Sequence, residues 1–192
     1  MAWIELVAAL VSVAAVWLTA LRRVVSCPIG IASVILYAWV FIAARLYSDA
    51  LLQGVFGVMI VYSWVYWKRH LDAGDRVAIA PLAHGSATLH VCLGAVCAVV
   101  LGYVMQRWTN AALPWLDSAL TAFSLVAQWW QARRHVAAWW LWIVVDVIYV
   151  GEYVYKWLDI TSVLYAGFVV LAIIGVRQWR RAGRAAAVAA AN

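Results

Sequence analysis

Charged residues are scarce in this sequence of 192 residues: they make up 11% of the chain, whereas about a quarter is typical of soluble domains. Hydrophobic residues account for 68%, and the mean hydropathy is +0.92. A chain of this size folded in water could not bury that much apolar surface. The composition therefore excludes a soluble protein and predicts an all-α integral membrane protein.

The sequence also lacks the motifs of several membrane-protein classes. It contains no G-x-S-x-G, no H-E-x-x-H and no G-x-x-x-x-G-K-[ST], so neither a hydrolase nor a nucleotide-driven pump is predicted. Its three cysteines form no C-x-x-C pair, and no metal or cofactor site is predicted. The only two lysines, Lys68 and Lys156, are expected at helix ends, which excludes a retinal protein. A carrier, a ligand sensor or a partner-dependent subunit remains.

Long apolar runs predict seven membrane-spanning helices. A span needs about 20 apolar residues, and unpaired backbone groups in hydrocarbon cost several kcal/mol each, which favours helices. The spans are expected near residues 3–21, 27–45, 49–67, 87–106, 113–131, 137–156 and 160–178. They form a single transmembrane domain over residues 1–181, and residues 182–192 are expected to be a frayed cytoplasmic tail.

Basic residues gather on one side of the predicted spans. Eleven of the fourteen follow spans one, three, five and seven, and only Arg45, Arg107 and Lys156 fall on the other side. Because basic loops stay in the cytoplasm, the N-terminus is predicted outside and the C-terminus inside. Topology thus accounts for the net charge of +6, and no nucleic-acid partner is predicted.

Two parts of the chain resemble each other at a shift of 111 to 112 residues. "RRVVSCPIGIASVILY" and "RRHVAAWWLWIVVDVIY" both begin with paired arginines and reach a tyrosine, and spans three and seven both end on a tryptophan, Trp67 and Trp179. The pattern predicts two three-helix units, residues 3–67 and 113–179, joined by a linker helix at 87–106. Since one span separates them, the units form a parallel 3+1+3 repeat, which in transporters holds the substrate between the halves.

Polar and aromatic residues share one face of the span at 137–156. Trp139, Trp142, Asp146, Tyr149 and Tyr153 fall within an arc of roughly 100°. An aspartate inside a span costs about 2.5 to 3.5 kcal/mol, so Asp146 is expected to face protein or water and to have a partner. The rings beside it predict a wet, aromatic-walled cavity that suits a flat cationic ring. Alternatively, Asp146 is buried and only locks neighbouring helices together.

Other spans contribute further candidates. Gln128 lies on the polar stripe of span five, Gln53 and Trp64 on that of span three, and Tyr37 on that of span two. Hydrogen bonding between helices is the structural alternative for such residues.

Two ionisable residues have competing interpretations. Glu152 either pairs with Lys156 four residues later or acts as a charge at the mouth that attracts a cation. For His90, a hydrogen-bonded helix residue is favoured over a proton relay.

These motifs resemble the Pnu family of bacterial vitamin transporters over roughly Glu5 to Arg181. The resemblance rests on "VWLTALRRVVSCPIGIASVILYAWVF", "LYSDALLQ", "WWLWIVVDVIYVGEYVYK" and "TSVLYAGFVVLAIIGVRQWRR". The motifs of the family fall on residues of the predicted site: W-x-x-W-x-x-x-D on Trp139, Trp142 and Asp146, Y-x-x-K on Tyr153 and Lys156, and L-Q on Leu52 and Gln53. Cys27 stands where the family is expected to have Trp, and Glu152 where it is expected to have an apolar residue.

The resemblance implies a function and an architecture. The best-known members carry nicotinamide riboside, and relatives carry thiamine or riboflavin. The resemblance implies a SWEET-like 3+1+3 fold, facilitated diffusion through the bacterial inner membrane, trapping of the vitamin by phosphorylation, and a homotrimer in membrane lipid. We expect nicotinamide riboside, with its ring among Trp and Tyr side chains and its ribose bonded by Gln53, Gln128 and Asp146. A thiamine or riboflavin carrier and a non-transporting vitamin-binding sensor or subunit remain alternatives.

Overall fold

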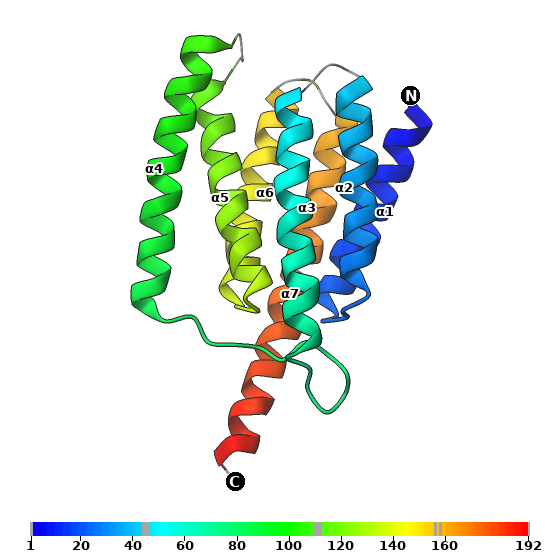
Figure 1. Ribbon diagram of the computed structural model, residues 1–192, viewed down its shortest axis with the longest axis vertical. Helices are drawn as coiled ribbons and strands as arrows, with labels where there is room; N and C mark the ends of the chain where they lie inside the picture. Colours follow the sequence, from blue (N-terminus) through cyan, green and yellow to red (C-terminus); the bar gives the residue numbers. More distant parts are fainter. Residues whose placement is uncertain (1, 44–46, 110–112, 156, 158, 192) are drawn as a thin grey trace.

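A computed structural model of the protein describes residues 2–43, 47–109, 113–155, 157 and 159–191, which form a bundle of helices (Figure 1). Within these residues there are seven helices and no β-strand longer than an isolated bridge. The helices are α1 (Ala2–Ala20), α2 (Ser26–Ala43), α3 (Tyr47–Lys68), α4 (His84–Trp108), α5 (Pro114–Ala132), α6 (Ala137–Tyr155) and α7 (Asp159–Ala191). Each overlaps one of the predicted helical segments, so the predicted all-α fold is confirmed.

Six of the helices are long and apolar enough to cross a membrane, counted over the described residues. The exception is α5, which carries Asp117, Gln128 and Gln131. This helix contacts α3, α4 and α6, and it buries Ser118 and Ser124. Because other helices surround much of it, α5 does not need the apolar surface of a helix that faces lipid.

Helix α7 is longer than the sequence predicted. It continues through the last span and the arginines behind it to Ala191, and Figure 1 shows its C-terminal part projecting from the bundle. Alanine has the highest intrinsic helix propensity, so the Ala-rich segment extends the helix. The prediction of a frayed tail is therefore wrong for residues 182–191.

The helices pack as two groups of three and a peripheral helix. Helix α2 contacts α1 and α3, and α6 contacts α5 and α7. We call residues 2–68 the first unit and residues 114–191 the second unit. The units meet where α1 packs on α7 and where α3 packs on α5, while α4 contacts only α5 among the described helices (Figure 1).

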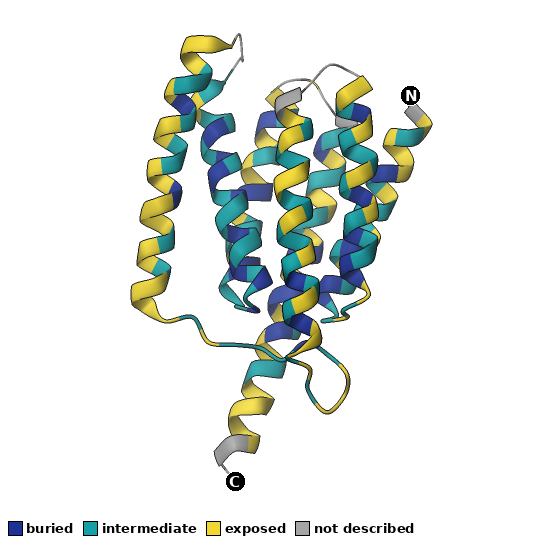
Figure 2. Ribbon diagram, viewed as in Figure 1, coloured by how far each residue is buried: buried dark blue, intermediate teal, exposed yellow. Residues whose placement is uncertain are grey.

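Helix α4 turns a long apolar surface outwards. Only Gly94 and Gly102 are buried on it, and Figure 2 shows most of its surface exposed or half-buried. Leu89, Leu93 and Val96 are each more than half exposed. A surface of this kind is stable in lipid and not in water, which agrees with the membrane location that the composition predicts.

The connections α1–α2, α3–α4 and α5–α6 all lie at one end of the bundle (Figure 1). We call it the basic end, because these connections carry Arg22, Arg23, Arg133 and Arg134. The main buried cluster includes Cys27 and Val77 and three tryptophans that are at most 2% exposed, Trp67, Trp139 and Trp179. Their rings meet edge to face, with centroids 5.5 Å apart for Trp139 and Trp179 and 6.1 Å apart for Trp67 and Trp179.

Candidate functional site

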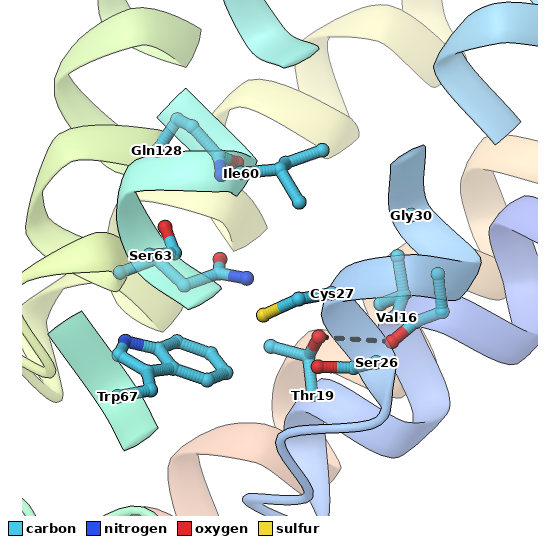
Figure 3. A pocket seen from close by; sticks show the side chains of 11 residues that line it. Val16, Thr19, Ser26, Cys27, Gly30, Ile60, Ser63, Trp67 and Gln128 are labelled. Carbon is cyan, nitrogen blue, oxygen red and sulfur yellow. Dashed lines mark hydrogen bonds between the residues drawn. The ribbon is translucent and has the colours of Figure 1, made fainter. Parts of the chain in front are cut away.

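A cavity of about 100 Å³ lies between the first unit and α5, next to the tryptophan cluster (Figure 3). Its wall contains hydroxyl, thiol and amide groups but no charged side chain: it is formed by Ala15, Val16, Thr19, Ser26, Cys27, Gly30, Ile60, Ser63, Trp67, Gln128 and Gln131. We call it the polar cavity. At about 30 Å³ per water it has room for about three waters, whereas ligand pockets usually exceed about 300 Å³. The cavity as the structure has it is therefore smaller than a usual ligand pocket.

Short polar side chains of α1, α2 and α3 face one another across the cavity (Figure 3). The Thr19 hydroxyl donates to the Ala15 carbonyl at 2.9 Å, and the Ser63 hydroxyl donates to the Met59 carbonyl at 2.7 Å. Both hydroxyl oxygens can still accept hydrogen bonds from a guest. The Ser26 hydroxyl is buried and has no hydrogen-bond partner among the described residues. An unpaired buried hydroxyl costs about 1 to 3 kcal/mol, so a guest that bonds Ser26 gains that energy.

Helix α5 contributes two amides, Gln128 and Gln131, which are three residues apart and therefore on one face. The indole Nε1 of Trp142 on α6 donates to Oε1 of Gln131 at 2.6 Å. Because this bond occupies the amide oxygen, the NH₂ group of Gln131 remains to donate to a guest. Trp142 thus positions a side chain of the cavity wall without being part of the wall.

Of the nine residues predicted for the substrate site, all of which the structure describes, only Gln128 lines the polar cavity. Trp142 reaches the cavity indirectly, through Gln131. Trp139 is 1% exposed and packs against Trp179. A Cβ atom on Gly175 would lie 2.4 Å from Cδ2 of Trp139, so the glycine makes room for that ring. In this conformation Trp139 is a core residue.

Asp146 lies outside the wall of the polar cavity and is 5% exposed. Among the described residues no side chain forms a recorded hydrogen bond or ion pair with it, and its expected partner remains a prediction. Its electrostatic neighbour is Tyr165 of α7, whose ring centroid lies 4.8 Å from that of Tyr149 and 5.0 Å from that of Tyr153. We call these three side chains the tyrosine cluster. The predicted aromatic-walled cavity beside Asp146 and its contact with substrate both remain predictions.

The other predicted site residues lie apart from the cavity. Trp64 packs beside the tryptophan cluster and has Nζ of Lys68 4.6 Å from its ring centroid. Tyr37 stacks on Phe41 at 5.9 Å, and Gln53 is half-buried on α3. The structure does not bring these three residues together, and their role in binding remains a prediction.

The two ionisable residues with competing interpretations have different outcomes. His90 accepts a hydrogen bond from the indole of Trp130 at 3.0 Å, which confirms it as a hydrogen-bonded helix residue. Glu152 is buried, and Lys156, its predicted partner, lies outside the described residues. Among the described residues, no group of three or more His, Cys, Asp or Glu side chains could hold a metal ion.

Comparison with known proteins adds a family and a fold. The family described as nicotinamide mononucleotide transporter matches residues 2–181. The nicotinamide riboside transporter PnuC of Escherichia coli (strain K12) is 24% identical over 96% of this chain and 87% of its own length. The nicotinamide riboside transporter PnuC of Neisseria mucosa is 28% identical over 81% of this chain and 61% of its own length. The riboflavin/roseoflavin transporter RibM of Streptomyces davaonensis is 24% identical over 66% of this chain and 61% of its own length.

A solved structure, "Crystal structure of the Vitamin B3 transporter PnuC", has a similar arrangement of helices. It matches with a TM-score of 0.79 and 22% identity over 95% of this chain and 82% of that chain. At this level of identity the likeness shows a shared fold.

Proposed function

The chain belongs to the nicotinamide mononucleotide transporter family, and from this premise we propose that it carries nicotinamide riboside by facilitated diffusion. Two relatives named for this vitamin support the proposal, one of them aligned with 96% of the chain. The family and the relatives are transporters and not enzymes, in line with the predicted absence of catalysis. The protein is accordingly a multi-pass protein of the bacterial inner membrane.

The neutral wall of the polar cavity favours the riboside over the mononucleotide. A mononucleotide carries a phosphate, which proteins usually bind with Arg or Lys. The cavity offers only hydroxyl, thiol, amide and indole groups as polar partners. These groups suit ribose hydroxyls and a carboxamide. This is the single observation that carries the choice of substrate.

We assign roles to the site from this chemistry. Gln128 and Gln131 donate to ribose hydroxyls, and Ser26 gains the partner it lacks. The pyridinium ring is assigned to the face of Trp142, where cation–π attraction favours a cation, and Asp146 and the tyrosine cluster stay candidates for contact with the vitamin. Gln53, Trp64, Trp139 and Tyr37 stay candidates for other stages of the transport cycle. At about 100 Å³ the cavity must widen before a whole vitamin can bind.

We propose that the two units form a parallel repeat and rock around this site. Supporting this, α1 and α5 have the same length and lie 112 residues apart at both ends, and α3 and α7 begin 112 residues apart. The contacts between the units are also equivalent, since the first helix of each unit packs on the third helix of the other: α1 on α7, and α5 on α3. The basic end is then cytoplasmic, with the N-terminus outside. A homotrimer remains the expectation for the assembly.

Uptake into proteoliposomes tests the proposal. Labelled nicotinamide riboside is expected to enter saturably without a proton or sodium gradient, and an excess of the mononucleotide should compete poorly. Strict dependence on an ion gradient would overturn facilitated diffusion. Binding without uptake would indicate a sensor.

Riboflavin is the second candidate substrate, because RibM is among the relatives. Thiamine follows from the Pnu resemblance. Competition that is stronger with either vitamin than with unlabelled riboside would replace the proposed substrate.

A further inference from the structure

We propose that Trp67 and Trp179 latch the basic end of the carrier shut through two reciprocal hydrogen bonds between the units. The proposal rests on the proposed function, because a latch is meaningful only if the two units move during transport. It assigns to these buried tryptophans a role in the cycle beyond core packing.

The two bonds mirror each other. The indole Nε1 of Trp67, at the end of α3, donates to the carbonyl of Ala132 at the end of α5, with a distance of 2.9 Å. The indole Nε1 of Trp179 on α7 donates to the carbonyl of Thr19 in the last turn of α1, at 3.1 Å. In both cases the third helix of one unit is tied to the first helix of the other. Neither unit can move away from its partner at this end without breaking a bond.

A segment of the α3–α4 connection covers the tryptophan pair. This segment, residues 77–80, is called the strap. The side chain of Val77 is 0% exposed and belongs to the same buried cluster as Trp67 and Trp179. Figure 1 shows that the connection runs beneath the bundle at the basic end. Val77 is therefore packed into the same cluster as the two indoles, from a connection that runs along the basic end.

The strap is bound to both units by matching arginine turns. In the first unit, Nη1 of Arg22 donates to the Val77 carbonyl at 3.0 Å, and the Val77 N–H donates to the Arg22 carbonyl at 3.0 Å. In the second unit, Nη1 of Arg134 donates to the Ala78 carbonyl at 2.9 Å, and the Ala80 N–H donates to the Arg134 carbonyl at 3.1 Å. Both arginines have left-handed backbones, with φ of 60° and 69°. The strap thus bridges the same boundary that the indole bonds cross.

The latch lies between the polar cavity and the basic end. Trp67 belongs both to the cavity wall and to the cluster that contains Val77. A vitamin in the cavity can leave towards the basic end only after Trp67 and Val77 move aside. Separation of the units at this end breaks the two indole bonds, the hydrogen bond from Arg133 to the Tyr62 hydroxyl at 2.9 Å, and the bonds of the strap to one of the units. The two indole bonds are the reciprocal part of this closure, so their loss should make opening of the basic end more frequent.

Cys27 provides a reporter for opening. Its thiol lies in the cavity wall and is 3% exposed, so a maleimide reaches it only when the cavity opens. The other two cysteines, Cys92 and Cys97, lie on α4 and are replaced by Ala to give a single-cysteine background. In oriented proteoliposomes, a membrane-impermeant maleimide is added either at the basic end or at the opposite end.

The variants remove the donors and keep aromatic rings. Trp67→Phe and Trp179→Phe are each expected to raise the rate of Cys27 labelling from the basic end by about three- to tenfold, the size of one net hydrogen bond. The double variant should exceed both, and labelling from the opposite end should fall or stay level. Trp108→Phe, at a residue that is 74% exposed on α4, is the control and should change nothing.

The outcomes separate the latch from general loosening. Equal labelling of the wild type and the double variant from the basic end would overturn the latch, and so would faster labelling from both ends. If the Phe variants do not fold, Val77→Ala keeps both indole bonds and opens the space below them, and it should also raise labelling from the basic end alone. A wild type that takes up no nicotinamide riboside but shows the labelling changes would sink the substrate proposal and leave the latch standing.

Discussion

Substitution of Trp142 separates two roles that the structure gives to one side chain. Its indole N–H holds the amide oxygen of Gln131 at 2.6 Å, and its ring is a candidate for stacking on the vitamin. Trp142→Phe removes the donor and keeps a ring, whereas Trp142→Ala removes both. One net hydrogen bond is worth about 0.5 to 1.5 kcal/mol, and aromatic stacking on a base about 1 to 3 kcal/mol.

These magnitudes predict an order of affinities for nicotinamide riboside. At about 1.4 kcal/mol per tenfold change, Trp142→Phe should weaken binding about two- to twelvefold, and Trp142→Ala by about five- to 150-fold beyond that. Calorimetric titration of purified protein measures both. Trp140→Phe is the matched control, because Trp140 neighbours the site in sequence but is 52% exposed.

A double-mutant cycle tests the positioning of Gln131. In a Gln131→Ala background the indole has no acceptor there, so adding Trp142→Phe should cost little. If the two substitutions are additive, Trp142 does not act through the amide. If even Trp142→Ala binds like the wild type, neither role exists and the assignment of this end of the cavity is refuted.

Three further predictions concern packing, the cavity and the basic end. Gly175→Ala should lower the free energy of unfolding by about 1 to 3 kcal/mol, because the new Cβ would clash with the Trp139 indole. Unfolding in detergent measures this loss. Gly167→Ala is the control, because no atom lies within 4 Å of a Cβ at that position. Cys27→Trp should fill the polar cavity and abolish binding of nicotinamide riboside in a calorimetric titration. Cys27→Ala is the control and should bind normally. Normal binding by Cys27→Trp would contradict this assignment of the site. Burial of Asp72 opposes its ionisation, but hydrogen bonds from a guanidinium and two backbone N–H groups lower its pKa overall. Ionised Asp72 should therefore stabilise the α3–α4 connection at neutral pH, and this stabilisation should be lost as the pH falls below about 4. Proteolysis of the connection measures this loss, and Asp72→Asn should remove the pH dependence.

The helices and their order could be predicted from the sequence because lipid imposes a strong condition on it. Every span must satisfy its backbone internally and present apolar side chains, and both requirements are visible in composition. The polar stripe of α5 was also informative, since Gln128 does line the cavity. Helix α7 was predicted too short, because a window for apolar residues ends at the arginines while helix propensity continues to Ala191.

Part of the cavity wall could not be predicted, because isolated small residues carry no periodic signal. Cys27 and Ser63 are ordinary helix-contact residues until tertiary packing leaves space between them. Trp139 does not line the cavity in this conformation, for the converse reason. The face of α6 that carries it was correctly identified as turned towards protein, but whether a ring lines a hole or fills it depends on the opposite helix, here Gly175.

The proposed repeat explains why the polar cavity lies beside the first unit and has no counterpart at the equivalent position of the second. At a shift of 112 residues, the latch tryptophans correspond to each other, and Trp139 corresponds to Cys27. Gly175 likewise corresponds to Ser63. In the second unit a large indole lies against a glycine, and the space is filled. In the first unit a thiol lies near a hydroxyl, and about 100 Å³ stays open.

The two units therefore have the same residue, tryptophan, at the basic end, and different residues at the positions that fill or line the polar cavity. Identical units would offer two equivalent half-sites, and an asymmetric vitamin could bind in either of two orientations. If the vitamin binds in the polar cavity as proposed, Trp139 fills the equivalent half, and the ribose should meet the same hydroxyl and amide groups in one orientation. Exchange of the corresponding residues between the units should move the cavity to the second unit. The exchanged protein carries Cys27→Trp and Ser63→Gly in the first unit and Trp139→Cys and Gly175→Ser in the second. Titration of the exchanged protein with nicotinamide riboside tests this. If the units correspond, the exchanged protein should recover the binding that Cys27→Trp alone abolishes. If the exchanged protein folds but does not bind, the correspondence between the units has no role in binding.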